Sequence, residues 1–470
     1  MLVNNKLCAC FLFLLFLSCN KDIDFGGESS NNNSNNSSNN SLILVSGNDQ
    51  VGLQNSPLLN NIVIRVENEL GEIVPGVNLS TQIVAGGGQI ISPLFNSDEN
   101  GIVNISWRLG EFYDNVLKVY PSSDEAVSVI INAEAKYNYN LPNTVNDGLS
   151  VTPITEITDK FTSLYDGMDE IRKGNISNIH SMVVSIDNSV VFEEYFDGTN
   201  SGGQFISYNR DTAHELQSVS KSYIGIMAGI AIDKGFIESD QVPISDFYPE
   251  LNYLSSGGKE DILLEHFLTM SSGLEWDENN LIEFYGTPWE NVHTYVLSKP
   301  LESIPGSNFE YSTGTSAIIN KLIVKSIDTD YPLFAQTYYS DLIESNWLPG
   351  TGEPLDFRNT PRDMLKLGQI YLNNGKWKDT QIVSESWVEK STTPHFNVTS
   401  TDSYGYQWWI RQFNTDNNSY NCFYALGYGG QFIFVVKELN LVAVFTGGNF
   451  NSDMYIPYSI MEQYILPAFE

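Results

Sequence analysis

Basic residues are scarce in this chain of 470 residues. Lysine and arginine number 24 against 57 aspartates and glutamates, so the formal net charge at pH 7 is −33. The sequence also lacks any run of basic residues. Proteins that bind nucleic acids neutralise phosphates with clustered lysine and arginine, so the composition argues against nucleic acid as a partner and against polyanionic substrates. An acidic surface that keeps the protein soluble is the simpler explanation of the charge.

Several catalytic signatures are also missing. There is no Gly-x-Ser-x-Gly elbow, which disfavours an α/β-hydrolase, and no glycine-rich phosphate loop. The stretch that begins at His214 lacks the second histidine of a zinc-protease helix. The other four histidines likewise have no metal-binding spacing; they are His180, His266, His293 and His395. The sequence therefore indicates no metal site.

The apolar run at the N-terminus is too short to cross a bilayer, which takes about 20 residues. Residues 7–17 are apolar, and Ser18 and Cys19 follow them. A basic start, a short apolar core and a small residue before a cysteine are typical of a secretory signal, and Phe16-Leu17-Ser18-Cys19 resembles a bacterial lipobox. We therefore expect residues 1–18 to be a lipoprotein signal peptide and Cys19 to carry a lipid that anchors the chain to a membrane. A plain signal peptide cut nearby is the alternative.

The segment after Cys19 predicts where the protein resides. Its acidic start resembles the signal that sends lipoproteins of some Gram-negative bacteria to the cell surface, which predicts an outer-membrane lipoprotein of the cell envelope. Residues 19–41 then become rich in Gly, Ser and Asn, a composition that forms a flexible tether. With Cys8 and Cys10 removed and Cys19 lipidated, Cys422 has no disulfide partner. We expect Cys422 to be a small core residue, not a nucleophile.

Residues 42–137 have the pattern of an all-β domain. Short alternating stretches such as Ile62-Val-Ile-Arg-Val-Glu are separated by turns, with no helical period, which predicts a β-sandwich. Ser46-Gly-Asn-Asp-Gln-Val-Gly, Gly86-Gly-Gly and Asn100-Gly-Ile-Val-Asn-Ile-Ser-Trp resemble a bacterial Ig-like domain of the invasin type. A spacer is the default role, and a glycan or protein partner stays open. Residues 138–150 are expected to be a linker.

The strongest catalytic signal is a Ser-x-x-Lys pair, Ser218 and Lys221, at the start of an apolar helix closed by Gly235. Residues three apart on a helix lie on one face, so the lysine can serve as the base that activates the serine. Burial disfavours an ammonium, which makes a neutral lysine amine the expected form. Two other Ser-x-x-Lys pairs, Ser18/Lys21 and Ser256/Lys259, have no such helix behind them.

Residues 151–470 resemble the serine β-lactamase and penicillin-binding-protein-like hydrolases, especially the esterase and amidase branches. The resemblance implies an α+β fold, with an antiparallel sheet flanked by helices, a helical subdomain beside it and the nucleophile between them. It implies no metal and no organic cofactor. Besides the Ser218/Lys221 helix, it rests on His180-Ser-Met-Val-Val, Ile262-Leu-Leu-Glu-His-Phe-Leu-Thr-Met-Ser-Ser-Gly-Leu-Glu-Trp276, Glu310-Tyr-Ser-Thr, Thr360-Pro-Arg-Asp-Met and Leu426-Gly-Tyr-Gly-Gly-Gln.

The resemblance also assigns roles within the site. Ser218 matches the family's nucleophile, and Lys221 and Tyr311 match the two groups that share the proton transfer, without a formal base being singled out. The backbone N–H groups of Ser218 and Gln431 match the oxyanion hole, which stabilises the negative oxygen of the tetrahedral intermediate.

The chain departs from the family pattern at two places. Thr313 replaces the asparagine of the family's Tyr-x-Asn element. A threonine hydroxyl has one donor and a shorter reach, so we do not expect it to make the contact to a substrate amide that the asparagine makes. Tyr428-Gly429-Gly430 stands where Lys-Thr-Gly is frequent, so the substrate-binding strand has no cation to hold a carboxylate. The aromatic residues nearby can line a cleft, although strand alternation sends about half of them into the core. They are Tyr404, Tyr406, Trp408, Trp409, Tyr424 and Tyr428.

These residues predict a serine hydrolase that forms an acyl-enzyme on Ser218 and acts on small esters or amides. A β-lactamase or a D-alanyl-D-alanine peptidase is the alternative within the same chemistry. A non-catalytic cell-surface binding protein that keeps the fold is the alternative from another class, since Thr313 and Tyr428 differ from the family pattern.

Overall fold

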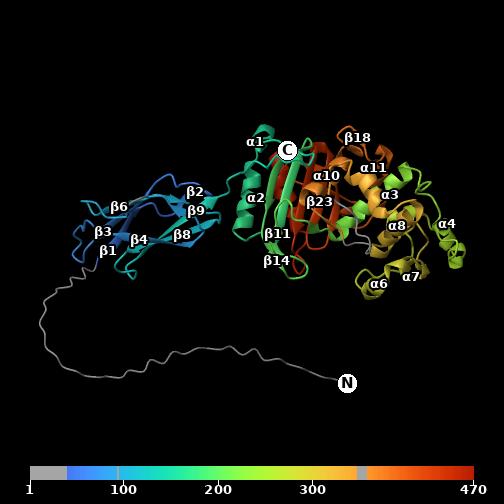
Figure 1. The fold of residues 1–470 in the computed structure, drawn as a ribbon, viewed down its shortest axis with the longest axis horizontal. Helices are drawn as coiled ribbons and strands as arrows, with labels where there is room; N and C mark the ends of the chain where they lie inside the picture. The colour runs from blue at the N-terminus through green and yellow to red at the C-terminus, as the bar shows by residue number, and fades with distance from the viewer. Residues whose placement is uncertain (1–39, 93–94, 347–356) are drawn as a thin grey trace, which may run out of the picture.

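The structure is a computed structural model that describes residues 40–92, 95–346 and 357–470. The predicted signal peptide, the predicted lipidation site Cys19 and nearly all of the Gly/Ser/Asn segment lie outside the described residues. Within the described ranges, no helix combines the length and the apolarity that a membrane crossing requires. Figure 1 shows an all-β part at the N-terminal end and a larger part built from a sheet and helices.

The N-terminal part consists of two main sheets around one core. Alternate residues are buried in the central strands, as in β3, where Ile62, Ile64 and Val66 point inward. Trp107 and Leu109 are fully buried in the same core. The first sheet has the order β1 (Ser41–Ser46), β3 (Ile62–Glu67), β6 (Ile102–Ile105), and the second β2 (Gln50–Leu53), β9 (Val129–Lys136), β8 (Asp114–Pro121), β4 (Leu79–Ala85). A separate two-stranded sheet, β5 (Gln89–Ile90) and β7 (Trp107–Arg108), completes the N-terminal part. The strands follow the predicted alternation, and the assignment to the Ig-like class stays a prediction.

A nine-stranded sheet dominates the larger part. Its neighbouring strands run antiparallel except for the short β10–β12 pair, which is parallel. The order is β10 (Ser150–Val151), β12 (Ser189–Tyr195), β11 (Ile179–Ile186), β24 (Leu441–Gly447), β23 (Gln431–Val436), β22 (Ser419–Gly427), β21 (Trp409–Asn414), β20 (Asp402–Tyr404), β19 (Phe396–Asn397).

Both faces of the sheet centre are covered, so β11, β23 and β24 are buried along their whole length. In β23, Phe432 and Phe434 face one core, while Ile433 and Val435 face another. Strands covered on both faces read as continuous apolar runs. The first core contains α2 (Thr162–Arg172), α12 (Ile456–Ile460) and α13 (Leu466–Phe469), and the second contains α3 (Ser220–Asp233), α8 (Thr313–Ser326) and α10 (Pro361–Leu372).

Helix α3 is buried on all sides from Ser220 to Ala231, as its largely apolar sequence predicts. Two glycines allow its neighbours to approach. A Cβ on Gly229 would meet the indole of Trp387 at 2.5 Å, and a Cβ on Gly225 would meet the side chain of Gln407 at 3.3 Å. The helix therefore holds its N-terminal end in a fixed position against α8, with which it packs.

The predicted linker, residues 138–150, lies against the larger part through polar contacts. Arg362 of α10, whose side chain is 2% exposed, forms ion pairs with Asp147 at 2.9 Å and with Glu193 at 2.6 Å, and it donates to the carbonyl of Asn143 at 2.8 Å. A buried guanidinium requires partners of this kind. Cys422 lies in a core, as predicted, and burial raises the pKa of its thiol, which makes it a poor nucleophile.

Two histidines on the edge of the core form a buried pair. His180 of β11 and His214 of β15 (His214–Glu215) are 2.9 Å apart from Nδ1 to Nε2, and Nδ1 of His214 lies 3.1 Å from the carbonyl of Glu215. A carbonyl only accepts, so Nδ1 of His214 carries its proton and Nε2 accepts from His180. Burial, with His214 adding to it, lowers the pKa of His180 to about 3, and burial also lowers the pKa of His214.

This pair predicts a loss of stability in acid. The unfolded chain binds a proton at His180 near pH 6.5, whereas the folded chain does so only near pH 3. The unfolded state thus binds more protons between these values, and the free energy of unfolding falls as the pH drops through that window. We expect His180→Phe to reduce the fall between pH 7 and pH 4 by about 2 kcal/mol, measured by denaturant unfolding at both pH values. The control is His395→Phe, which makes the same change at an exposed histidine. Equal pH dependence of the free energy of unfolding in the wild type and both variants would contradict the role of buried His180 in the loss of stability in acid.

Candidate active site

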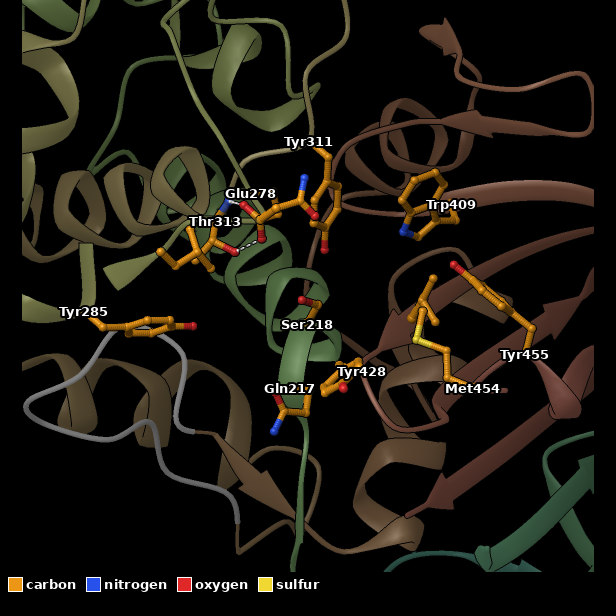
Figure 2. Close-up of a pocket in the computed structure, with 13 residues that line it drawn as sticks. Gln217, Ser218, Glu278, Tyr285, Tyr311, Thr313, Trp409, Tyr428, Met454 and Tyr455 are labelled. Atoms are coloured by element: carbon orange, nitrogen blue, oxygen red, sulfur yellow. Dashed lines mark hydrogen bonds between the residues drawn. The ribbon is translucent and has the colours of Figure 1, made fainter. Parts of the chain in front are cut away.

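A pocket of about 820 Å³ opens beside the N-terminal ends of α3 and α8 (Figure 2). Four residues for which the sequence predicts a catalytic or substrate-binding role line it, namely Ser218, Tyr311, Thr313 and Tyr428. The remaining lining residues come from the turn before α3, the loop between α5 (Leu264–Leu268) and α6 (Ile282–Gly286), α6 itself, strands β21 and β22, and the segment before α12. They are Gln217, Glu278, Asn279, Leu281, Tyr285, Trp409, Leu426, Met454 and Tyr455.

Ser218 lies in a 3₁₀ turn, η1 (Gln217–Val219), immediately before α3, and not within the α-helix itself. The turn is possible because Gln217 has a φ of 49°, a left-handed conformation that non-glycine residues rarely adopt. Ser220 stabilises the turn by donating from its hydroxyl to the carbonyl of Gln217 at 2.6 Å. Backbone strain of this kind often occurs at functional sites, where the surrounding structure maintains it.

Lys221 lies directly beneath Ser218. Its Nζ is 3.0 Å from Oγ of Ser218 and 3.2 Å from Oγ1 of Thr313. The side chain is among the largest fully buried ones, with the residue 2% exposed. Among the described residues, no carboxylate oxygen lies within 4.0 Å of this amine. The structure thus brings together the serine and the lysine that the spacing pairs, in a place that water reaches poorly.

Tyr311 covers the amine with its ring. Nζ of Lys221 lies 5.0 Å from the ring centroid, and the other contacts of the ring are with Trp409, stacked at 5.8 Å, and Tyr404, edge-on at 6.5 Å. Figure 2 shows the phenol of Tyr311 pointing toward Ser218. The aromatic contacts hold the ring over the amine of Lys221, with the phenol on the side of Ser218.

Thr313 is held by a residue that the sequence did not single out. Glu278 accepts from the Thr313 hydroxyl at 2.5 Å with Oε1 and from the Thr313 N–H at 2.8 Å with Oε2, which also accepts from the indole of Trp276 at 2.7 Å. Because the Thr313 proton goes to Glu278, its hydroxyl oxygen faces Lys221 as an acceptor. Glu278 follows the Ser-Ser-Gly-Leu-Glu-Trp landmark closely, but one acid among many carries no signal of its own.

The turn between β22 and β23 closes another side of the pocket. Gly429 and Gly430 have φ values of 86° and 96°, which only glycine adopts without strain. A Cβ on Gly427 would lie 2.4 Å from the carbonyl oxygen of Leu216, so this strand end touches the turn that carries Ser218. The side chain of Gln431 is fully buried and bonds both the N–H and the C=O of Gly447. That anchor fixes the backbone of Gln431, whose predicted oxyanion role stays a prediction.

The aromatic residues near the site divide between pocket and core. Trp409 and Tyr428 line the pocket, and Tyr428, which is 52% exposed, donates from its phenol to the carbonyl of Phe450 at the rim. The others are buried, namely Tyr404, Tyr406, Trp408 and Tyr424. Burial raises the pKa values of all three of those tyrosines, so none of them is an acid or base near neutral pH.

Known proteins are similar to the part of the chain that contains Ser218. The model of the family described as Beta-lactamase matches residues 177–349, which contain the Ser218 turn, α3 and α8. This segment of the chain is similar to a Beta-lactamase family domain. An uncharacterized protein of Alkalihalophilus pseudofirmus is 24% identical over 302 residues, 58% of this chain and 84% of that protein. The 6-aminohexanoate-dimer hydrolase of Paenarthrobacter ureafaciens is 24% identical over 273 residues, 50% of this chain and 66% of the hydrolase.

Solved structures extend the similarity to the fold. A family VIII carboxylesterase superposes with a TM-score of 0.52 at 15% identity, over 66% of this chain and 97% of the esterase. The Beta-lactamase-like fold predicted from the sequence, with its mixed α and β content, is therefore confirmed for the larger part of the chain. The pocket at Ser218 lies between the matched segment and the later strands of the sheet. It is the candidate active site.

Proposed function

We propose that this protein is a serine hydrolase that works through an acyl-enzyme on Ser218. The carrying observation is the 3.0 Å contact between Oγ of Ser218 and Nζ of the buried Lys221, at a pocket large enough for a small substrate. The likeness to hydrolases, among them one that acts on the 6-aminohexanoate dimer, supports the same chemistry.

The contacts suggest how the proton moves. A neutral amine at Lys221 has two N–H groups and one lone pair, and the acceptor oxygen of Thr313 takes one of the N–H groups. The lone pair is then available to Ser218, which loses its proton as its oxygen attacks the substrate carbonyl carbon. Lys221 and Tyr311 together pass this proton to the leaving group, and backbone N–H groups of Ser218 and Gln431 stabilise the oxyanion. A water molecule then attacks the acyl carbonyl carbon in the same way, which releases the carboxylic acid product and returns a proton to the Ser218 oxygen.

The pocket favours esters and amides over penicillins and D-peptides. Both latter classes carry a carboxylate, and none of the described lining residues is a lysine or an arginine. Tyr428 occupies the position at which relatives of those classes have a cation. Small esters or amides without a carboxylate are therefore the proposed substrates.

A substrate panel tests this proposal. The purified protein is expected to hydrolyse p-nitrophenyl butyrate, with kcat/KM at least about 100-fold higher than for a chromogenic cephalosporin, because a fully unpaired substrate carboxylate costs about 3 kcal/mol. Faster hydrolysis of the cephalosporin would reverse the ranking. Failure to hydrolyse any ester, together with failure of a fluorophosphonate to label the protein, would favour a non-catalytic cell-surface binding protein.

We further propose that Cys19 is lipidated and that the chain is an outer-membrane lipoprotein of the bacterial cell envelope. The all-β part would then be an Ig-like spacer, with a glycan or protein partner open, that holds the hydrolase away from the membrane. The lipobox-like residues 16–19 and the two-sheet architecture of residues 42–137 support these assignments.

A further inference from the structure

The charge of the active-site pocket carries information about the substrate. Apart from the tyrosines, Glu278 is the only one of the described lining residues that has an acidic or basic side chain. Lys221 is close, but it is 2% exposed and separated from Glu278 by the Thr313 hydroxyl. The space that a substrate enters thus presents one carboxylate and no lysine, arginine or histidine.

Glu278 is close to the reacting atoms. Contacts of 3.0, 3.2 and 2.5 Å join Oγ of Ser218 to Oε1 of Glu278 through Lys221 and Thr313. Three neutral donors hold the carboxylate, two on Oε2 and one on Oε1, and none of them removes its charge. If Glu278 only stabilised the N-terminal end of α8, that role would explain its contact with the Thr313 N–H. Such a role does not require the Glu278 carboxylate to face the pocket.

The surroundings strengthen the negative potential. The pKa of the neighbouring Glu310 is raised, first by partial burial and then by the charges of Glu302, Asp277 and Glu278. Four tyrosines and one tryptophan also line the pocket, and the faces of such rings attract cations, above all alkylammonium groups. They are Tyr285, Tyr311, Tyr428, Tyr455 and Trp409. A net charge of −33 attracts cationic ligands from a distance.

We propose that the preferred substrates are esters or amides that carry an ammonium group close to the scissile carbonyl, and that Glu278 is the residue that selects them. This inference rests on the proposed hydrolase function. The ammonium lies against the carboxylate of Glu278 and the neighbouring ring faces while the carbonyl carbon lies at Ser218.

Matched ester pairs test the proposal, because replacing a quaternary nitrogen by carbon removes the charge and keeps the shape. The first pair is 2-(trimethylammonio)ethyl butyrate and 3,3-dimethylbutyl butyrate. The second is the p-nitrophenyl esters of 4-(trimethylammonio)butyrate and 5,5-dimethylhexanoate. We expect the charged member to have a kcat/KM about ten-fold higher in at least one pair, with a smaller preference in 0.5 M salt, roughly the concentration at which screening becomes strong.

The variant Glu278→Gln should bring that ratio close to one, whatever its overall activity. The matched control is Glu275→Gln, which removes the same charge from an exposed residue of the same loop that does not line the pocket, and it should keep the wild-type ratio. A ratio near one for both pairs in the wild type, or an unchanged ratio in Glu278→Gln, would overturn the proposal.

Protection of the wild-type protein gives a second readout if Glu278→Gln does not fold. Tetramethylammonium should slow labelling of Ser218 by a neutral fluorophosphonate, whereas tert-butanol at equal concentration should not. Equal effects of the two would overturn the proposal. If neutral esters are hydrolysed without any charge preference, only this inference fails; if no ester is hydrolysed and no label binds, the proposed function fails with it.

Discussion

Replacing Ser218 by alanine is expected to lower kcat for p-nitrophenyl butyrate by about 10⁴-fold or more, the size of effect seen when a nucleophile is removed from a coupled catalytic group. The change removes the proposed nucleophile, whose Oγ lies 3.0 Å from the buried amine of Lys221. Stopped assays of ester hydrolysis and fluorophosphonate labelling measure the effect. The thermal unfolding midpoint should change little, because Ser218 lies in the pocket wall and not in the core.

The chain supplies its own control for this experiment. Ser256 and Lys259 repeat the Ser-x-x-Lys spacing, but Ser256 is exposed, and Lys259 donates to the carbonyl of Leu297 at 2.7 Å. Ser256→Ala should retain full hydrolysis and labelling. Activity that survives in Ser218→Ala, or disappears in Ser256→Ala, would contradict the assignment of the nucleophile.

Replacing Lys221 by methionine should lower the rate of acylation by about 10³-fold, within the range for loss of a general base. The thioether fills the same volume but has no basic nitrogen, so Ser218 and Thr313 lose the group that joins them. Burst kinetics with p-nitrophenyl butyrate separates acylation from deacylation. The free energy of unfolding should stay equal or rise, since burying an amine costs stability that a thioether does not.

A structural role for Lys221 predicts the opposite pair of results. Lys221→Met would then lower the free energy of unfolding and leave the acylation rate of the remaining folded protein close to normal. Lys259→Met provides the matched control at the second Ser-x-x-Lys pair and should change neither quantity by much. Tyr311→Phe should slow the same step, because its phenol points toward Ser218 (Figure 2) and is proposed to share the proton transfer.

Much of this fold could be predicted because period and apolarity are local properties. The alternation of Ile62–Glu67 and the apolar character of Ser220–Asp233 each determine which faces are buried, and the structure has a strand and a buried helix there. After Gln431, strand β23 is an unbroken apolar run because helices cover both of its faces. The order of nine strands depends on contacts between distant segments, which no local pattern contains.

The site divides in the same way. Ser218 and Lys221 were evident because a helix brings residues three apart together, and Tyr311 and Thr313 because they belong to a recognisable motif. Glu278 was missed because its importance comes from a contact with Thr313, 35 residues further along the chain. The left-handed Gln217 was missed as well, since the strained turn depends on the packing around it.

Mass spectrometry of the acyl-enzyme tests the central claim most directly. The wild-type protein is mixed with p-nitrophenyl butyrate, quenched in acid within the burst and digested, and the modified peptide is sequenced. The account predicts a butyryl group on Ser218 in the wild type, its absence in Ser218→Ala and a much slower appearance in Lys221→Met. Turnover without any acyl group on Ser218, or with the acyl group on another residue, would contradict it.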